Sequence, residues 1–159
     1  MEKILYVQIQ EYFTSNGLTT KYQHAYRQGH STSTALTQMT DDWLREIDDS
    51  KVVAAVMLDF SAAFDVIDHE LLIKKRISYG FTPTAVTLIK SYLSSRTQRV
   101  YYNGSLSQSS SHLTCGVPQG SCLGPLLFSI FTNDLSSAVK NASMQLTLIM
   151  NSIKFYHKN

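Results

Sequence analysis

The fold is decided by the stretch Val52–Asp68, which reads VVAAVMLDFSAAFDVID. An almost unbroken apolar run from Val52 to Leu58 opens it, and a run of this length is typical of a central strand buried on both faces of a sheet. Asp59 ends the run. A carboxylate in that place needs water, a partner or a metal ion, because burying its charge unpaired is costly. The residues alone leave two interpretations open, a strand-end Asp that caps a turn and a metal-binding carboxylate.

A second stretch, Gly116–Phe128, favours the metal-binding interpretation. It reads GVPQGSCLGPLLF. Gly120 allows a backbone to approach a ligand that a side chain would block, and Gln119 carries a donor and an acceptor that suit the edge of a nucleotide or template. A lone PQG is a weak signal, but with LDFSAAFDVIDH upstream it resembles the reverse transcriptase domain of non-LTR (LINE-type) retrotransposons. The sequence blocks follow the order of that family over nearly the whole chain.

The resemblance implies an α+β fold of the right-hand polymerase type, in which an antiparallel sheet packs against helices in a palm and fingers. We expect residues 1–159 to form a single partial domain. It is fingers-like over about 1–50 and palm-like, with some fingers elements, over about 51–159, and the family's thumb is expected to be absent. The implied activity is RNA-directed DNA synthesis by a two-metal mechanism. The implied partners are an RNA template, a DNA primer and deoxynucleotides, and the implied cofactor is Mg²⁺.

Further site residues follow from the resemblance. Arg27 lies in YQHAYRQGHS, which is similar to the family's QFGFRxGRST block. A guanidinium in this place reaches the triphosphate of the incoming nucleotide, because its N–H groups match phosphate oxygens in pairs. Phe64 is expected to pack under the sugar and exclude a 2′-hydroxyl, and Phe60, Gln119 and Gly120 are expected to bind the nucleotide. Without the resemblance, Arg27 is interpreted as a solvated side chain and Phe64 as a core residue.

The end of the chain departs from the family pattern. The family's aromatic-Ala-Asp-Asp hairpin is expected within Met144–Tyr156, and the best alignment puts Asn151 and Ser152 at the two Asp positions. No Asp or Glu follows Asp134. Asp59 is left as the expected catalytic and metal-binding carboxylate, and one carboxylate cannot offset the charge of two divalent ions. We therefore expect impaired Mg²⁺ binding and little or no polymerase activity.

Three alternatives stay open from the sequence. The chain can be a non-enzymatic nucleic-acid-binding remnant or a domesticated interaction module. It can also fold poorly and expose the apolar surface of its sheet. Finally, Asp65 or Asp134 can replace the lost metal ligands, although nothing in their spacing argues for it. Asp68 is instead expected to cap the helix that follows it.

Composition sets broad limits. The chain has 159 residues, of which 43% are hydrophobic and 16% charged, so it can form one domain with a real core. Its net charge of +2 favours weak binding to nucleic acid at best. Cys115 and Cys122 have no zinc spacing and are expected to be ordinary thiols. No signal peptide and no apolar run near the ~20 residues of a membrane span are apparent, so an intracellular location, nucleus or cytoplasm, is expected. The oligomeric state is left open.

Periodicity predicts the local structure. Helices are expected over residues 2–15, 32–47, 69–79 and from Pro83 and Pro125 onward. In the second helix an apolar stripe that runs from Leu36 to Ile47 is expected to face the core. Strands are predicted over 96–103 and 112–117, with a turn signal at Asn103-Gly104 and a hairpin loop at Ser105–His112. The short charge run Lys74–Arg76 is expected to form a solvated face.

Overall fold

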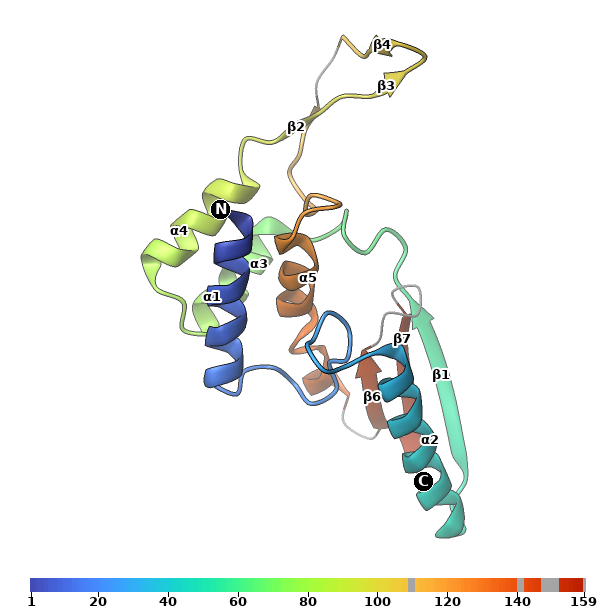
Figure 1. The fold of residues 1–159 in the computed structure, drawn as a ribbon. Coiled ribbons are helices and arrows are strands. Elements are labelled where there is room, and N and C mark those ends of the chain that lie inside the picture. Colours follow the sequence, from blue (N-terminus) through green and yellow to red (C-terminus); the bar gives the residue numbers. More distant parts are fainter. Residues whose placement is uncertain (109–110, 140–141, 147–151, 159) are drawn as a thin grey trace.

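The computed structural model describes residues 1–108, 111–139, 142–146 and 152–158. Four helices form the body: α1 (Glu2–Ser15), α3 (His69–Ser78), α4 (Pro83–Leu93) and α5 (Leu123–Thr132). A fifth, α2 (Thr32–Asp48), lies outside the body along a small sheet, and a hairpin projects from the other end of the molecule (Figure 1). The short 3-10 helix η1 (Leu135–Ala138) follows α5. This is the mixed architecture of helices and a small antiparallel sheet that the sequence predicts.

Helix α5 is the centre of the body. Its sequence LGPLLFSIFT is nearly all apolar, and seven of its ten residues are buried. Helices α1 and α3 pack against it, and α3 also packs against α4. The stretches Val52–Asp68 and Gly116–Phe128 are called the two motifs from here on. Buried side chains from all four helices and from the two motifs form one core, which contains Ile9, Phe13, Ala63, Ile67, Leu72, Ile89, Leu93, Val117, Leu123, Leu126, Leu127, Phe128 and Ile130. Both motifs are therefore anchored in the same core.

The three-stranded sheet is antiparallel, with the order β1-β7-β6. Its strands are β1 (Val53–Asp59), β6 (Ala142–Leu146) and β7 (Ser152–Lys158). The prediction of a central strand buried on both faces is wrong, because β1 is an edge strand and most of its side chains are exposed, such as Met57 at 62% and Leu58 at 48%. An apolar run shows that a strand could be buried. Whether the strand is buried depends on which other elements of the chain pack on it.

The projecting hairpin corrects two predicted strands. It contains two short ladders, β2 (Thr97–Gln98) with β5 (Ser111–His112) and β3 (Tyr101–Tyr102) with β4 (Ser105–Leu106). Ser105–His112, expected to be a loop, therefore supplies both returning strands, and the predicted strand over 112–117 is wrong beyond its first residue. The turn at Asn103-Gly104 is confirmed, since both residues have positive φ, 48° and 79°. Adjacent positive φ values fit the tight turn that follows the twist of a hairpin.

The helix cap predicted at Asp68 is confirmed, whereas the predictions for two helix faces are wrong. Ser31 caps α2 and Asp68 caps α3, its carboxylate accepting the Leu71 N–H at 2.7 Å. The stripe of α2 is largely exposed, with Ile47 at 55%, and only Ala35 and Met39 are buried. The solvated face expected at Lys74–Arg76 is wrong for Arg76, which is fully buried.

Two remaining expectations concern cysteines and membranes. Cys115 and Cys122 are both free and exposed. Across the described helices, none has the length and apolar character required to cross a bilayer.

Candidate functional site

The two sequence motifs meet directly in the structure. The Gly116 N–H donates to the Ile67 carbonyl and the Val117 N–H to the Phe64 carbonyl, both at 2.8 Å. His69 Nε2 lies 2.6 Å from the Gly116 carbonyl oxygen. Gly116 has φ of +83°, and an added Cβ would lie 2.9 Å from the Asp65 carbonyl oxygen. A side chain at this position is therefore excluded by both its backbone angle and its neighbour, which fixes the two motifs in one register.

A cavity of about 470 Å³ lies at this junction. Its walls come from the residues after Asp59, from the start of the PQG block and from the loop before α2. The lining residues are Tyr26, Ala62, Ala63, Phe64, Asp65, Pro118, Gln119, Gly120, Ser121 and Pro125. The structure thus brings together Phe64, Gln119 and Gly120, three of the residues expected to bind a nucleotide.

Phe64 is held in place by aromatic neighbours. Its ring centroid lies 5.1 Å from that of Phe128 in the core and 6.1 Å from that of Tyr26, which also lines the cavity. Burial raises the pKa of Tyr26, so its hydroxyl stays a neutral donor at physiological pH. Edge and tilted ring contacts favour one orientation of the rings. Phe64 therefore presents a firm wall to anything in the cavity.

Gln119 is oriented by a carboxylate. Its Nε2 donates to both oxygens of Asp65, at 2.9 and 3.2 Å. Since the amide group is planar, fixing its nitrogen also fixes the direction of its carbonyl oxygen, which accepts hydrogen bonds. Gly120 follows with φ of +78°, and an added Cβ there would meet no atom within 4 Å. The floor of the cavity is thus open at Gly120 and polar at Gln119.

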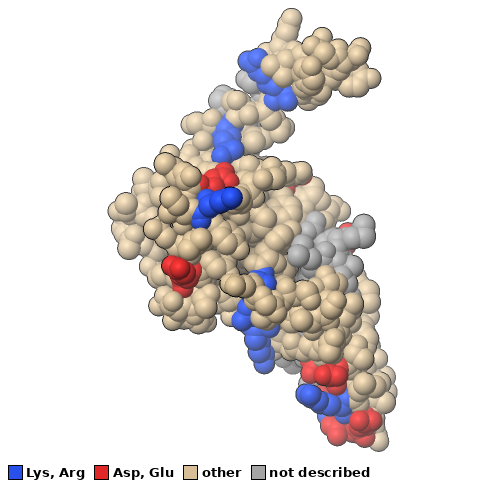
Figure 2. All heavy atoms as spheres, in the orientation of Figure 1, with Lys and Arg blue, Asp and Glu red and all other residues tan. Residues whose placement is uncertain are grey.

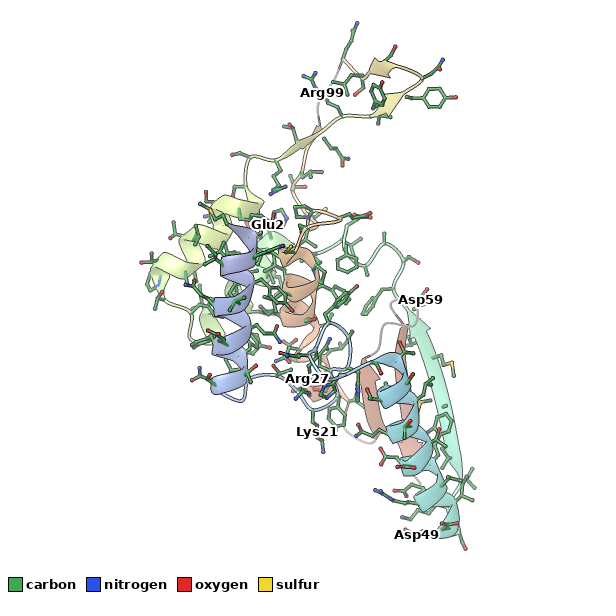
Figure 3. The ribbon with its side chains drawn as sticks, viewed as in Figure 1. Glu2, Lys21, Arg27, Asp49, Asp59 and Arg99 are labelled. Carbon is green, nitrogen blue, oxygen red and sulfur yellow. The ribbon has the colours of Figure 1, made fainter. Side chains whose placement is uncertain are left out.

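Arg27 and Phe60 lie near the cavity but are absent from its described lining. Arg27 Nη1 lies 3.4 Å from the Thr20 carbonyl and 3.5 Å from the Gln23 carbonyl, and the side chain faces two other hollows, beside α1 (Figure 3). The Phe60 ring packs edge-on against Phe128, with 6.0 Å between centroids. Their expected roles at the nucleotide stay predictions.

Asp59 lies at the end of β1, exposed and away from the cavity lining (Figure 3). Its partner in the β1–β7 register is Ser152. The register therefore pairs Asp59 with a residue that the sequence alignment puts at a family Asp position. Asn151, the other replaced position, lies outside the described residues.

A two-metal centre does not fit the residues present. In the described parts of the chain, no three His, Cys, Asp or Glu side chains gather in a way that could hold a metal ion. A divalent pair needs several carboxylates against its charge, and Asp59 supplies one. We derive no reaction step through a metal ion for this chain.

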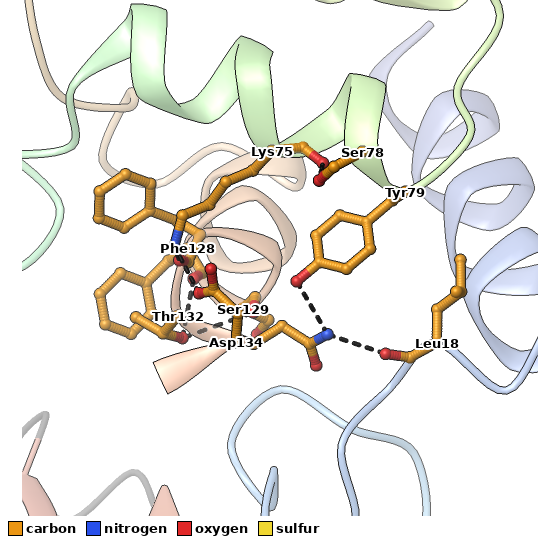
Figure 4. Close-up of polar contacts among 10 residues, drawn as sticks. Leu18, Lys75, Ser78, Tyr79, Phe128, Ser129, Thr132 and Asp134 are labelled. Carbon is orange, nitrogen blue, oxygen red and sulfur yellow. Dashed lines mark hydrogen bonds and ion pairs between the residues drawn. The ribbon is translucent and has the colours of Figure 1, made fainter. Parts of the chain in front are cut away.

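Asn133 and Asp134, which follow α5, make structural contacts (Figure 4). Asn133 Nδ2 donates to the Leu18 carbonyl at 2.8 Å and to the Tyr79 hydroxyl at 3.1 Å. Lys75 Nζ donates to the Asp134 carboxylate and, at 2.7 Å, to the Phe131 carbonyl. Both residues thus shape the end of α5, and Asp134 is engaged by a cation away from Asp59.

Sequence reasoning missed two residues of the cavity. Tyr26 has φ of +54° and directly precedes Arg27, so the block that pointed to Arg27 also contained Tyr26. Asp65 directly follows Phe64, and its bond to Gln119 joins residues 54 positions apart. Only the fold reveals such a pair, because no local pattern connects the two motifs.

Comparisons with known proteins agree with this arrangement. The sequence profile of the reverse transcriptase (RNA-dependent DNA polymerase) family matches residues 1–156. The chain therefore belongs to the reverse transcriptase family.

Its relatives include three Drosophila melanogaster proteins. A "Probable RNA-directed DNA polymerase from transposon BS" is 36% identical over 134 residues, 84% of this chain and 15% of that protein. A "Probable RNA-directed DNA polymerase from transposon X-element" is 30% identical over 134 residues, 84% of this chain and 14% of that protein. The "RNA-directed DNA polymerase from mobile element jockey" is 34% identical over 115 residues, 72% of this chain and 12% of that protein. The resemblance to non-LTR retrotransposon enzymes is confirmed, and the chain spans 12–15% of the length of these relatives.

Proposed function

We propose that this chain is the deoxynucleotide-binding part of an RNA-directed DNA polymerase and has little or no polymerase activity by itself. The observation that supports this proposal is the cavity at the motif junction, lined by Phe64, Gln119 and Gly120. A volume of about 470 Å³ lies within the range of pockets that enclose small molecules. The partners of this site are an RNA template, a DNA primer and deoxynucleotides, in an intracellular setting. Residues 1–50 act as the fingers-like part and residues 51–159 as the palm-like part.

Phe64 selects the sugar in this proposal. Its ring is packed against Phe128 and faces Tyr26, so it cannot move aside for an added hydroxyl. A rigid aromatic wall under the sugar rejects a 2′-hydroxyl by contact, and the packed neighbours make the rejection effective. Gln119, fixed by Asp65, offers its amide oxygen as an acceptor for a donor on the nucleotide.

The weak chemistry follows from the residues around Asp59. The β1–β7 register pairs Asp59 with Ser152, a neutral and weaker ligand for Mg²⁺ than a carboxylate. Nucleotide binding and nucleotidyl transfer are therefore separable in this chain. The cavity can accept a nucleotide even where the metal ions that drive transfer are poorly held.

Primer extension tests the catalytic half of the proposal. The full chain, Asp59→Ala and Asn151→Asp/Ser152→Asp are compared on a primed RNA template with Mg²⁺ or Mn²⁺. We expect no extension by the natural chain and detectable extension by the double Asp variant. Extension by the natural chain that is lost in Asp59→Ala would show that another group completes the site. If none of the three proteins extends the primer, nucleotide binding is tested by the next measurement.

Nucleotide binding tests the other half without any chemistry. Dissociation constants for dATP and ATP are measured by calorimetry for the natural chain and for Phe64→Val. We expect the natural chain to favour dATP and Phe64→Val to lose most of that preference. Phe131→Val is the control, because Phe131 lies on the same helix as Phe128 but is absent from the cavity lining. An equal loss in both variants contradicts the role of Phe64.

The alternative, a non-enzymatic nucleic-acid-binding module, is supported by the distribution of charge. Residues 71–133 contain no Asp or Glu but six Lys or Arg, and three of these six, Lys74, Lys90 and Arg99, are exposed. The net charge of +2 conceals this basic stretch. A segment of this kind attracts an anionic polymer whether or not the chain is catalytic.

A further inference from the structure

The projecting hairpin is described over residues 97–108 and 111–112. Among the described residues, it carries the most exposed aromatic side chains. It leaves the body after α4 and stands clear of the helices (Figure 1). Tyr101 is 71% exposed and Tyr102 80%, and the neighbouring Val100 and Leu106 are 69% and 53% exposed. Adjacent strand residues point to opposite faces, so each face of this hairpin offers one Tyr ring.

Such a hairpin is poorly stabilised alone. Its two ladders contain two residue pairs each. Two-stranded hairpins are marginally stable in water, and rings that contact solvent contribute little to holding the strands together. Exposed apolar groups gathered on one element mark an interaction site. The hairpin therefore has the properties of a surface that gains stability when a partner covers it.

Charge indicates the chemistry of that partner. The hairpin lies inside the acid-free stretch 71–133 and carries Arg99 between its two ladders (Figure 3). Within the described chain Arg99 has no recorded hydrogen bond or ion pair, and it is exposed. Five of the twelve acidic residues lie together on or just after α2, namely Asp41, Asp42, Glu46, Asp48 and Asp49, where Arg45 and Lys51 offset part of their charge (Figure 2). An anionic partner is thus attracted to the hairpin and repelled from α2.

Arg96 holds the base of the hairpin in place. Its Nε donates to the Tyr92 carbonyl at 2.8 Å, and its guanidinium lies 4.5 Å from the centre of the Tyr92 ring. Tyr92 belongs to α4, and its hydroxyl donates to Glu2 at 2.9 Å. Arg96 therefore attaches the hairpin to α4 and, through Tyr92, to α1. Because Arg96 is engaged in this way, Arg99 is the cation of the described hairpin that a ligand can reach.

We propose that this hairpin binds single-stranded nucleic acid, with bases stacking on Tyr101 and Tyr102 and Arg99 contacting the phosphate backbone. Aromatic rings flanked by cations are the combination that binds unpaired bases with little sequence preference. Duplex DNA does not suit it, because its bases are already stacked. This surface lies outside the nucleotide cavity, and its binding is measured without nucleotides. Failure of either proposal is therefore distinguishable from failure of the other.

Fluorescence anisotropy of the full chain tests the proposal. The probes are labelled single strands of about 12 nucleotides, oligo(dT) and oligo(U), and a duplex of the same length. We expect Tyr101→Leu/Tyr102→Leu to weaken single-strand binding about tenfold or more, and Tyr101→Phe/Tyr102→Phe to keep it within about twofold. The Leu variant keeps an apolar surface and loses only the rings, so the pair separates stacking from general apolar contact.

Salt dependence tests Arg99 separately. Arg99→Ala is expected to lower the slope of log K against log salt by about 0.7, the value for one phosphate contact on a single strand. Lys21→Ala, in the exposed loop after α1 and far from the hairpin (Figure 3), makes the same change of charge and is expected to leave the slope unchanged. Circular dichroism checks that each variant folds.

Three results would overturn the proposal. The first is no binding of either single strand by the natural chain at low salt. The second is equal affinity of the Leu and Phe double variants, or equal binding of duplex and single strand. The third is self-association of the natural chain in sedimentation that the Leu variant abolishes with no change of oligonucleotide affinity. That last result would mean that the hairpin binds the acidic end of α2 in a second copy of the chain.

Discussion

The motif junction and the three-stranded sheet differ strongly in how deeply their residues are buried. At the junction, Ile67 is fully buried and its carbonyl accepts the Gly116 N–H at 2.8 Å. In the sheet, β1 is an edge strand and Leu58, next to Asp59, is 48% exposed. The junction forms the proposed nucleotide cavity, and the sheet carries the expected metal carboxylate. The difference teaches that the proposed nucleotide cavity and the expected metal carboxylate lie on separate parts of this chain, so loss of one does not require loss of the other.

The largest expected effect compares one substitution in both regions. Leu127→Ala removes a fully buried side chain from the centre of the body and is expected to lower the free energy of unfolding by about 2–5 kcal/mol. Leu58→Ala makes the same change on exposed β1 and is expected to cost less than about 1 kcal/mol. Urea denaturation of the two variants and the natural chain measures both. Equal losses would show that the sheet is packed as firmly as the body.

The same comparison shows what the sequence could predict. The meeting of Phe64 with Gln119, the cap at Asp68 and the turn at Asn103-Gly104 follow from motifs or from local backbone chemistry, and the structure has all of them. The pairing of β1 with a strand in the expected C-terminal hairpin also agrees. These features depend on residues close in sequence or on the order of blocks that a family shares.

Burial was harder to predict, because it depends on distant elements. The apolar run of β1 lies at a sheet edge, and its length alone could not reveal that. Arg76 shows the opposite error. It follows Leu72 by four residues and so shares the inward face of α3, but its charge favoured a solvated position. Helical spacing was the better guide there, and the type of residue was the misleading one.

Arg76 gives the second prediction. Its guanidinium is fully buried, and its nitrogens have no hydrogen-bond partner in the described structure. Burying an unpaired charge is costly, so Arg76→Met, which keeps an unbranched side chain and removes the charge, is expected to raise the free energy of unfolding by about 1–4 kcal/mol. Lys74→Met, on the exposed side of the same helix, is expected to change it by less than about 0.5 kcal/mol. Urea denaturation at neutral pH measures both variants.

Alkaline pH sharpens this prediction. Burial lowers the pKa of Arg76 from its usual, higher value to about 9. Above about pH 9 the unfolded chain therefore keeps this proton while the folded chain loses it, and this linkage stabilises the fold as pH rises. The stability gap between Arg76→Met and the natural chain should narrow above about pH 9. A destabilised Arg76→Met at neutral pH would mean that the guanidinium has a compensating interaction.

Two carboxylates three positions apart give the third prediction. Asp68 caps α3 through the Leu71 N–H, so Asp68→Ala is expected to cost about 1 kcal/mol of stability and to leave nucleotide affinity unchanged. Asp65 is exposed and holds Gln119, so Asp65→Ala is expected to change stability by less than about 0.5 kcal/mol and to disturb nucleotide binding. Asp65→Asn keeps an acceptor and removes only the charge. It is therefore expected to bind dATP more tightly than Asp65→Ala in calorimetry, and equal binding by the two would contradict a positioning role for Asp65.

The smallest expected effect concerns acid and lies beside the cavity, in the loop that supplies Tyr26. His24 is 4% exposed, and its pKa is lowered from 6.5 by burial first and then by the charges of His30 and Arg27, against a contribution from Gln38 that raises it. Since the unfolded chain binds this proton at a higher pH than the folded chain, stability is full above about pH 6.5 and falls as pH drops toward the folded pKa. Urea denaturation from about pH 7.5 to about pH 5 should show this fall in the natural chain, and His24→Leu should flatten it. His30→Asn removes one of the three causes and should reduce the fall without abolishing it, whereas a fall of the same size in His24→Leu would assign the acid sensitivity to another group.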